Sequence, residues 1–337
     1  PTGAQRTTAR RLFATVLDTP GGMHIETIHA FCQSVLKRFP VEAGVAPHFE
    51  VLDDRDGGEL QRDAVREVVS HARHGENPAL AGALATITGY VNEDEFAELV
   101  GRLLSDRHRL IASLGTIGDT GLLGRVKATL GLPEDEERDA VAGAFCALEG
   151  GRAADLGRVA DAMLAGSVQD QKRGAPIRAW LDLPAERREA GLGDYKRGYL
   201  TAGGEPFKNF LTKGTLNKLP DGEDVMAAEC ARLLDCLGRL NDHETAAATA
   251  ALLLIARHVI AAYERRKRAR AALDFSDLIH KVRDLLTRDA GSAAWVLYKL
   301  DGGLDHLLVD EAQDTSPEQW ELLATLAEEF FAGESAH

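Results

Sequence analysis

The feature that most constrains this chain is an apolar run that leads directly into two acids: Leu307, Leu308 and Val309 are followed by Asp310 and Glu311. An unbroken aliphatic run of this kind is typical of a strand buried on both faces, as in a parallel sheet. Open α/β sheets bind their ligands at the carboxyl ends of their strands. We therefore expect the two acids to lie at the ligand-binding edge of a small sheet.

The residues after the acids predict the start of a helix. Ser316 is a suitable N-cap, Pro317 fits the first helical position, and Gln319 can close a capping box. The acids would then lie on a short strand-to-helix connection. There, Asp310 can hold Mg²⁺ on the phosphates of a nucleotide, and Glu311 can orient or deprotonate an attacking water. The plain alternative is a buried strand that ends in a solvated acidic turn.

Three segments resemble motifs of the superfamily-1 DNA helicases of the UvrD/Rep group. Residues 310–314, Asp-Glu-Ala-Gln-Asp, resemble motif II, and Thr27-Ile28-His29 resembles motif Ib. Residues 274–278 resemble an Asp-Phe-x-Asp-Leu element that precedes motif II in that group. Residues 39–45 are most similar to the AddA helicase–nuclease proteins of alphaproteobacteria, which act in double-strand-break repair. By itself, His29 would be interpreted as a helix-capping or core histidine.

The patterns predict a mainly α protein with a small parallel β-sheet. Residues 47–52 alternate like a strand, and the chain from about 57 to 264 is mostly helical. The resemblance implies a partial RecA-like (P-loop NTPase) α/β domain 1A with a large helical 1B insertion. We expect residues 1–56 and 265–337 to form the parts of domain 1A, and residues 57–264 to form the insertion.

Local patterns add three expectations. Met23, Ile25 and Thr27 alternate with polar residues and predict a short strand, and the residues that follow predict an amphipathic helix. Residues 166–224 are poorly periodic. Within them, the aromatic and basic residues of segment 207–213 favour a loop or hairpin that packs its two Phe side chains on helices. The alternative is a surface that stacks bases and neutralises phosphates.

The resemblance implies a longer parent protein that couples ATP hydrolysis to translocation on single-stranded DNA and to duplex unwinding. Asp310 would hold Mg²⁺, Glu311 would polarise the attacking water, Gln313 would sense the γ-phosphate of ATP, and Asp314 would position neighbouring groups. The implied cofactors are Mg²⁺ and ATP. The implied partners are single-stranded and double-stranded DNA and a nuclease protein similar to AddB.

Charge restricts where DNA can bind. The formal net charge is 39 − 53 = −14, which argues against nucleic-acid binding over the whole surface. Thr27 and His29 are the DNA contacts implied by motif Ib. Arg265, Arg266 and Arg268 belong to a run of cations, which also includes Lys267 and Arg270, and this run is a candidate basic track for DNA. Its alternative interpretation is a solvated helix face.

ATP hydrolysis in this group needs a phosphate-binding loop with a Gly-Lys pair. The 337 residues contain no Gly-Lys dipeptide. We therefore expect that loop to precede Pro1 in a longer chain, and the second motor domain to follow. On this interpretation the chain alone binds no cofactor tightly and does not hydrolyse ATP at a measurable rate.

The remaining signals favour a cytoplasmic protein. The four cysteines are scattered, as expected for reduced core thiols. We find no signal-peptide pattern and no apolar run that approaches the length of a membrane span, so we expect no membrane partner. Two other functions stay open: a non-catalytic helical module that docks DNA or protein, and a carboxylate–metal nuclease built on Asp310, Glu311 and Asp314.

Overall fold

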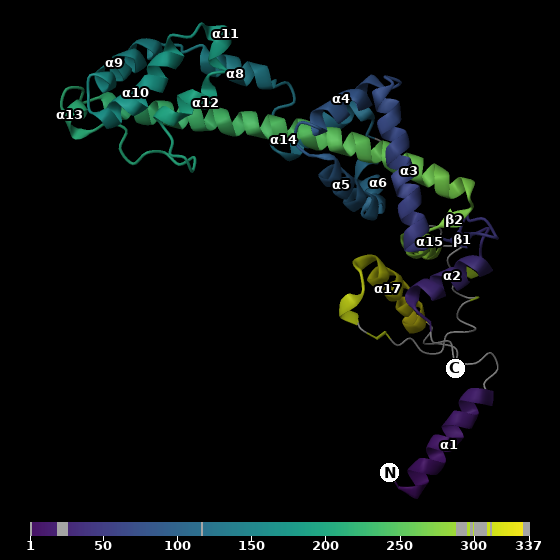
Figure 1. Cartoon of the computed structure of the whole chain (residues 1–337). Coiled ribbons are helices and arrows are strands. Elements are labelled where there is room, and N and C mark those ends of the chain that lie inside the picture. Colours follow the sequence, from purple (N-terminus) through teal and green to yellow (C-terminus); the bar gives the residue numbers. More distant parts are fainter. Residues whose placement is uncertain are drawn as a thin grey trace. The chain divides into compact units, whose positions relative to one another are not determined.

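A computed structural model describes residues 2–18, 26–115, 117–287, 295–296, 299, 309–310 and 312–332. These residues are mainly helical, with one two-stranded parallel sheet, as the sequence predicts (Figure 1). The described α-helices are α1 Gly3–Asp18, α2 Ile28–Arg38, α3 Asp54–Arg73, α4 Pro78–Ile87, α5 Glu93–Ser105, α6 Arg107–Leu114, α7 Leu122–Thr129, α8 Arg138–Cys146, α9 Arg152–Leu164, α10 Val168–Leu181, α11 Ala185–Arg188, α12 Leu192–Tyr195, α13 Lys213–Leu216, α14 Gly222–Ala269, α15 Phe275–Thr287 and α17 Pro317–Ala332. Short 3₁₀ turns are η1 Asp119–Gly121, η2 Lys196–Gly198 and η3 Ala312–Asp314, and the strands are β1 Glu50–Val51 and β2 Ala272–Leu273.

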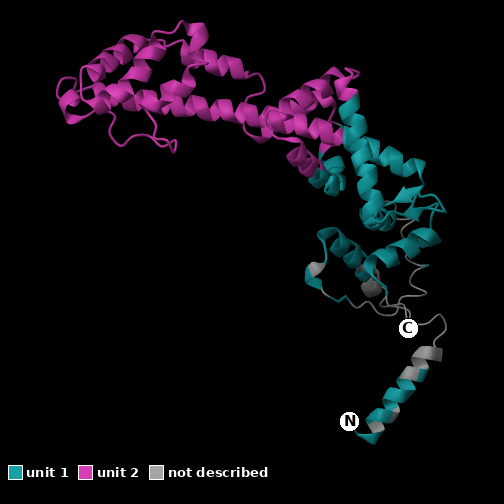
Figure 2. Ribbon diagram, viewed as in Figure 1, with its two compact units in different colours: residues 1–70, 101–113, 258–337 teal, residues 71–100, 114–257 magenta. Residues whose placement is uncertain are grey.

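The chain divides into two compact units (Figure 2). Unit 1 comprises Pro1–Ser70, Gly101–Ser113 and His258–His337, and unit 2 comprises His71–Val100 and Leu114–Arg257. The 48-residue helix α14 contributes its first part to unit 2 and its last part to unit 1. The predicted domain boundaries, at 56/57 and 264/265, stay predictions.

Strand β1 pairs in parallel with β2, with Glu50 opposite Ala272 and Val51 opposite Leu273. The amide of Glu50 donates to the carbonyl of Ala271 at 3.0 Å, and the amide of Leu52 donates to the carbonyl of Leu273 at 2.8 Å. The strand predicted within residues 47–52 is confirmed at Glu50–Val51. The pairing matters because it joins the early and late blocks that carry the helicase-like motifs. The strand predicted at Met23–Ile25 lies outside the described residues.

The core of unit 1 forms where α15 packs against both α2 and α17. Cys32 and Leu36 from α2, Val282 from α15 and Leu322 from α17 are all fully buried there. The predicted apolar face of α2 is confirmed, since Val35 and Phe39 are buried in the same cluster. This packing holds the first turn of α2 beside the first turns of α15 and α17.

Unit 2 has its own core, in which α9 and α10 pack together. Helix α10 forms within residues 166–224, although the sequence of that stretch is poorly periodic. Gly174 and Pro176 weaken the helical pattern in the sequence, but Ser167 and Asp170 form a capping box at the helix start. Gly174 also allows close packing, because a Cβ atom there would lie 2.7 Å from the Cβ atom of Met163.

Segment 207–213 is a loop that packs its aromatic side chains on unit 2, as predicted. Phe210 is buried, and the guanidinium of Arg173 lies 3.7 Å from the ring centre of Phe207. Asp170 fixes the loop by accepting hydrogen bonds from the amide and hydroxyl of Thr212. Phe210 is therefore not open to stack a nucleic-acid base, and Phe207 is partly buried beneath Arg173.

The structure also tests the expectations about the cysteines and about apolar helices. All four cysteines are free and buried, as predicted. The expectation that no apolar run approaches the length of a membrane span is wrong for α14. By length and composition, an 18-residue stretch of this helix is apolar enough to cross a membrane. Half of that stretch is buried within the protein, which fits a core helix.

Candidate nucleotide and DNA site in unit 1

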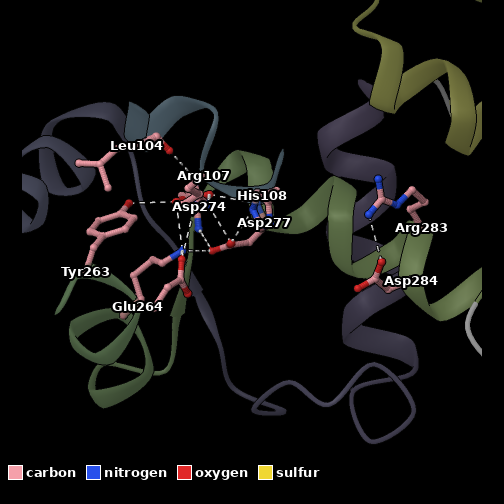
Figure 3. A network of polar contacts seen from close by, with 10 residues as sticks. Leu104, Arg107, His108, Tyr263, Glu264, Asp274, Asp277, Arg283 and Asp284 are labelled. Carbon is pink, nitrogen blue, oxygen red and sulfur yellow. Dashed lines mark hydrogen bonds and ion pairs between the residues drawn. The ribbon is translucent and has the colours of Figure 1, made fainter. Parts of the chain in front are cut away.

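Two acids, Asp274 and Asp277, hold the start of α15. The amide of Asp277 donates to Asp274 Oδ1 at 3.0 Å, and the amide of Asp274 donates to Asp277 Oδ2 at 3.1 Å. Asp274 thus caps α15 in the structure. Both carboxylates have further partners, drawn in Figure 3, which come from distant parts of the chain.

Arg107 and Lys267 neutralise these two acids. Arg107 Nη2 donates to both oxygens of Asp274, at 2.6 and 2.8 Å, and to Asp277 Oδ1 at 2.8 Å. Lys267 Nζ donates to Asp277 Oδ2 at 2.5 Å, and it also contacts Glu264. Burial opposes charge on Asp277, but His108, whose Nε2 lies 3.4 Å from Asp277 Oδ1, and the charges of Lys267 and Arg107 lower its pKa. The network is therefore a buried, ionised cluster that ties α6, α14 and α15 together.

Contacts within the protein limit which cations of the basic run on α14 are available to bind DNA. Lys267 is only 1% exposed and cannot contact DNA. Arg265 and Arg266 both pair with Glu67, Arg266 at 2.7 Å. Arg268 is exposed and donates to the carbonyl of Glu264. Of the three arginines predicted to bind DNA, Arg268 thus has no carboxylate partner among the described residues. The DNA contacts themselves stay a prediction.

The motif Ib residues lie at the start of α2. Thr27 is the N-cap, and its hydroxyl accepts a hydrogen bond from the amide of Ala30 at 3.2 Å. The ring of His29 lies edge-on to the ring of Phe275, with 5.2 Å between centroids. Burial lowers the pKa of His29, so the imidazole is neutral at pH 7. Thr27 therefore has a structural role as a cap, beside the DNA contact predicted for it.

His29 opens on a cavity of about 270 Å³ that lies entirely within unit 1. Its lining includes residues from four helical segments, namely His29, His108, Arg109, His280, Ser316 and Glu318. The rings of His108 and His280 stack with 3.8 Å between centroids. Burial and the neighbouring His108 lower the pKa of His280 to about 4. The cavity brings the predicted DNA residue His29 close to the helix that follows the acidic motif.

The acidic motif itself is only partly described. Asp310 and Gln313 are exposed, while Glu311 and the side chain of Asp314 lie outside the described residues. Leu307 and Leu308 also lie outside them. Val309 is 40% exposed and is not in a strand, which corrects the expectation of a buried strand at that position. The described sheet consists of β1 and β2 alone and gives Val309 no ladder partner.

The helix start predicted after the acids is confirmed. The amide of Ser316 donates to Gln319 Oε1 at 3.0 Å, and the amide of Gln319 donates to Ser316 Oγ at 3.3 Å. Helix α17 then begins at Pro317. The capping box fixes where the chain leaves the acidic motif, so Glu318 faces the cavity from the first turn of the helix.

An Mg²⁺ ion with a nucleotide fits the described part of this motif. Asp310 is exposed and can reach a ligand from solvent. Magnesium is commonly held by one or two carboxylates together with waters and phosphate oxygens, so a cage of protein ligands is unnecessary. Among the described residues no group of three or more His, Cys, Asp or Glu side chains could hold a metal alone. Asp310 would therefore act together with the phosphates.

Several residues of the site were not identified from the sequence, among them Arg107, His108 and Arg109. They lie within the stretch from about 57 to 264 that was predicted to be mostly helical, where the structure has α5 and α6 with a break at Asp106. An Arg-His-Arg triplet in a helical segment looks like an ordinary solvated face. No signal in the single sequence could have placed it against the acids of α15.

Comparisons with known proteins agree with the resemblance. A sequence profile described as the UvrD/REP helicase N-terminal domain matches residues 6–332. The chain is 26% identical over 348 residues to a protein from Lactiplantibacillus plantarum that is named as a subunit of an ATP-dependent helicase/nuclease, covering 92% of this chain and 26% of that protein. It is 36% identical over 72 residues to the protein of the same name from Staphylococcus carnosus, covering 21% of this chain and 6% of that protein. The chain thus spans about a quarter of the length of the first relative. Because the profile covers almost the whole chain, this protein belongs to the UvrD/REP helicase family.

Proposed function

We propose that this chain is part of the motor of an ATP-dependent DNA helicase that moves along single-stranded DNA and unwinds duplexes. In this proposal β1, β2 and the helices around them belong to a RecA-like domain 1A, and the helical region is its 1B insertion. One observation carries the proposal. The parallel pairing of β1 with β2 and the packing of α15 between α2 and α17 bring His29 and Ser316 to one cavity.

On the nucleotide side, the chain's own acids would supply the chemistry. Asp310 would hold Mg²⁺, which neutralises charge on the phosphates of ATP. Glu311 would take a proton from the attacking water or orient it. Gln313 would contact the γ-phosphate, and Asp314 would position neighbouring groups by hydrogen bonding. These roles rest on the match of residues 310–314 to motif II and on the exposure of Asp310 and Gln313.

On the DNA side, Thr27 and His29 would contact phosphate or sugar without reading sequence. A neutral imidazole suits this role, since it can donate or accept a hydrogen bond. Arg268 is exposed and pairs with no carboxylate among the described residues, so it would add a phosphate contact. Arg265 and Arg266 would have to leave Glu67 to do so.

Both relatives are named as one subunit of an ATP-dependent helicase/nuclease, which supports a role beside a further protein. We propose a nuclease partner similar to AddB, a function in double-strand-break repair by recombination, and a cytoplasmic location. A pull-down with the chain as bait, followed by a nuclease assay on the captured complex, tests the proposed nuclease partner.

The test of the catalytic role is Glu311→Gln in a longer chain that includes a phosphate-binding loop. Nucleotide affinity should change little, whereas ATP turnover should fall by about a hundredfold or more, in the range expected for loss of a general base. Equal loss of binding and turnover would contradict the role of Glu311. The 337-residue chain itself should show no measurable ATP hydrolysis, and DNA-stimulated turnover by it would contradict that expectation.

The test of DNA binding uses the 337-residue chain and a labelled oligothymidine. Affinity should fall steeply with salt, as it does when cations neutralise phosphates. Binding that is absent at low salt, together with tight binding of a protein partner, would favour the non-catalytic docking module instead.

A further inference from the structure

The cavity beside His29 contains an arginine that is held by an acid of the opposite helix. Arg109 Nε lies 3.3 Å from Glu318 Oε1, and the two side chains are 66% and 22% exposed. Arg109 belongs to α6, and Glu318 lies in the first turn of α17, two residues after the N-cap Ser316. The pair therefore connects α6 with the helix that follows the acidic motif, at the cavity that His29 also lines.

Among the described residues that line this cavity, Arg109 is the one permanent cation. Burial keeps His29 and His280 neutral at pH 7 by lowering the pKa of each. Two acids, Asp106 and Glu318, also belong to the lining. The affinity of the cavity for an anion thus depends on whether Arg109 is neutralised by Glu318 or is available.

The rest of the lining is suited to a phosphate group. Ser105, Ser276 and Ser316 contribute hydroxyl groups. The Nδ1 atom of His280 is buried and has no hydrogen-bond partner among the described residues. A volume of about 270 Å³ lies below the range of about 300–1,000 Å³ that is usual for pockets of drug-sized ligands. It is enough for part of a nucleotide, such as one phosphate with its sugar.

We propose that Arg109 binds a phosphate of the DNA strand that His29 contacts, and that Glu318 masks Arg109 until the strand is present. This inference rests on the proposed function, because it assumes that a DNA strand passes His29. An exposed ion pair is weak and is readily exchanged. A phosphate can accept two parallel hydrogen bonds from the guanidinium and therefore competes well with Glu318.

The exchange would link the two sides of the motor. The backbone amide of Glu318, then Ser316 Oγ and the charge of Arg109, lower the pKa of Glu318, so this carboxylate is ionised and held at the start of α17. When Arg109 turns to a phosphate, Glu318 loses its cation. The first turn of α17, directly after the acidic motif, is then released from α6. DNA occupancy would be communicated to the nucleotide side by this step.

A double-mutant cycle on the 337-residue chain tests the proposal. The variants are Arg109→Gln, Glu318→Gln and the double variant, with binding of labelled oligothymidine measured by anisotropy across a salt series. Glu321→Gln is the matched control, because Glu321 lies on the same helix and pairs with Arg283 at 3.4 Å outside the cavity lining. Circular dichroism checks that each variant is folded.

Glu318→Gln should tighten binding by about two- to fivefold, the range that exposed ion pairs are worth. Arg109→Gln should weaken binding and reduce the slope of log K against log salt by about 0.7, the value for one phosphate contact on a single strand. The double variant should bind like Arg109→Gln, and Glu321→Gln should bind like the unmodified chain.

Three outcomes would overturn the inference. Equal tightening by Glu318→Gln and Glu321→Gln, or tightening that persists without Arg109, would show a general charge effect and no masking. Salt-dependent binding that is weakened by Thr27→Asp but unchanged by Arg109→Gln would leave the proposed function standing and remove Arg109 from the DNA site. Absence of salt-dependent binding by every variant would overturn the inference, and together with tight binding of a protein partner it would also contradict the proposed function.

Discussion

Arg107 donates two hydrogen bonds to the carboxylate of Asp274, at 2.6 and 2.8 Å, although 167 positions separate the two residues in the chain. The same guanidinium donates to Asp277, and Tyr263 donates from its hydroxyl to Asp274 at 2.9 Å. A segment between two parts of the helical region is thereby fixed to the element that precedes the acidic motif. The relationship explains why Gly101–Ser113 belongs to unit 1.

Replacing Arg107 with Met should destabilise unit 1 by about 3–5 kcal/mol, because it leaves two buried carboxylates with Lys267 as their main cation. The measurement is the free energy of unfolding from urea denaturation. Arg66→Met serves as the control, since Arg66 is 78% exposed and pairs with Asp63 at 3.2 Å. The control should change stability by less than about 0.5 kcal/mol. Similar losses in both variants would contradict a special role for the buried pair.

Thr27 combines a helix cap with a predicted DNA contact, and two substitutions separate these roles. Thr27→Ala removes the cap and should cost about 1 kcal/mol of stability. Thr27→Asp keeps a good N-cap and adds a negative charge that repels phosphate. We expect Thr27→Asp to unfold like the unmodified chain and yet to bind oligothymidine more weakly. Unchanged DNA affinity in a stable Thr27→Asp variant would restrict Thr27 to its structural role.

Asp170 should make unit 2 sensitive to acid. Although burial opposes its charge, bonds from Thr212, Ser167 and Thr215 lower its pKa to about 2, from 3.8. A carboxylate whose pKa is lower in the folded state than in the unfolded state stabilises the fold at pH values above its unfolded-state pKa. This stability is lost as the pH falls from about 4 toward 2. At pH 7, Asp170→Asn should therefore cost about 2 kcal/mol.

The measurement for Asp170 is urea denaturation of the unmodified chain and of Asp170→Asn at several pH values. The stability difference between the unmodified chain and Asp170→Asn should be constant from pH 7 to 5 and should shrink below pH 4. A difference that does not depend on pH would mean that the hydrogen bonds act without the charge.

Gly174 is a position where α9 and α10 approach closely. A Cβ atom there would lie 2.7 Å from the Cβ atom of Met163 and 3.3 Å from the carbonyl of Ala160. We expect Gly174→Ala to lower the free energy of unfolding by about 1–3 kcal/mol through overpacking. Gly238→Ala is the control, since nothing lies within 4 Å of its added Cβ and it should stabilise α14 by about 0.5–1 kcal/mol. Stabilisation by both substitutions would contradict tight packing at Gly174.

The sequence alone determined the features that depend on residues close together in the chain. Asp53, Asp274 and Ser316 each accept a hydrogen bond from an amide three residues later, and the helix starts they indicate are found in the structure. The apolar face of α2 and the long helix α14 could be predicted for the same reason, because a helix places nearby residues on one face in a regular order. The motifs that led to the helicase family are also local.

Only the tertiary structure decided which charged residues are structural and which are exposed. Lys267 and Arg268 are neighbours in one basic run, yet Lys267 is buried against Asp277 while Arg268 is exposed. Likewise, nothing near Arg109 in the sequence indicates Glu318 as its partner. The physical reason is that an ion pair depends on distance in space, and long-range packing, here the contacts of α15 with α2 and α17, sets that distance.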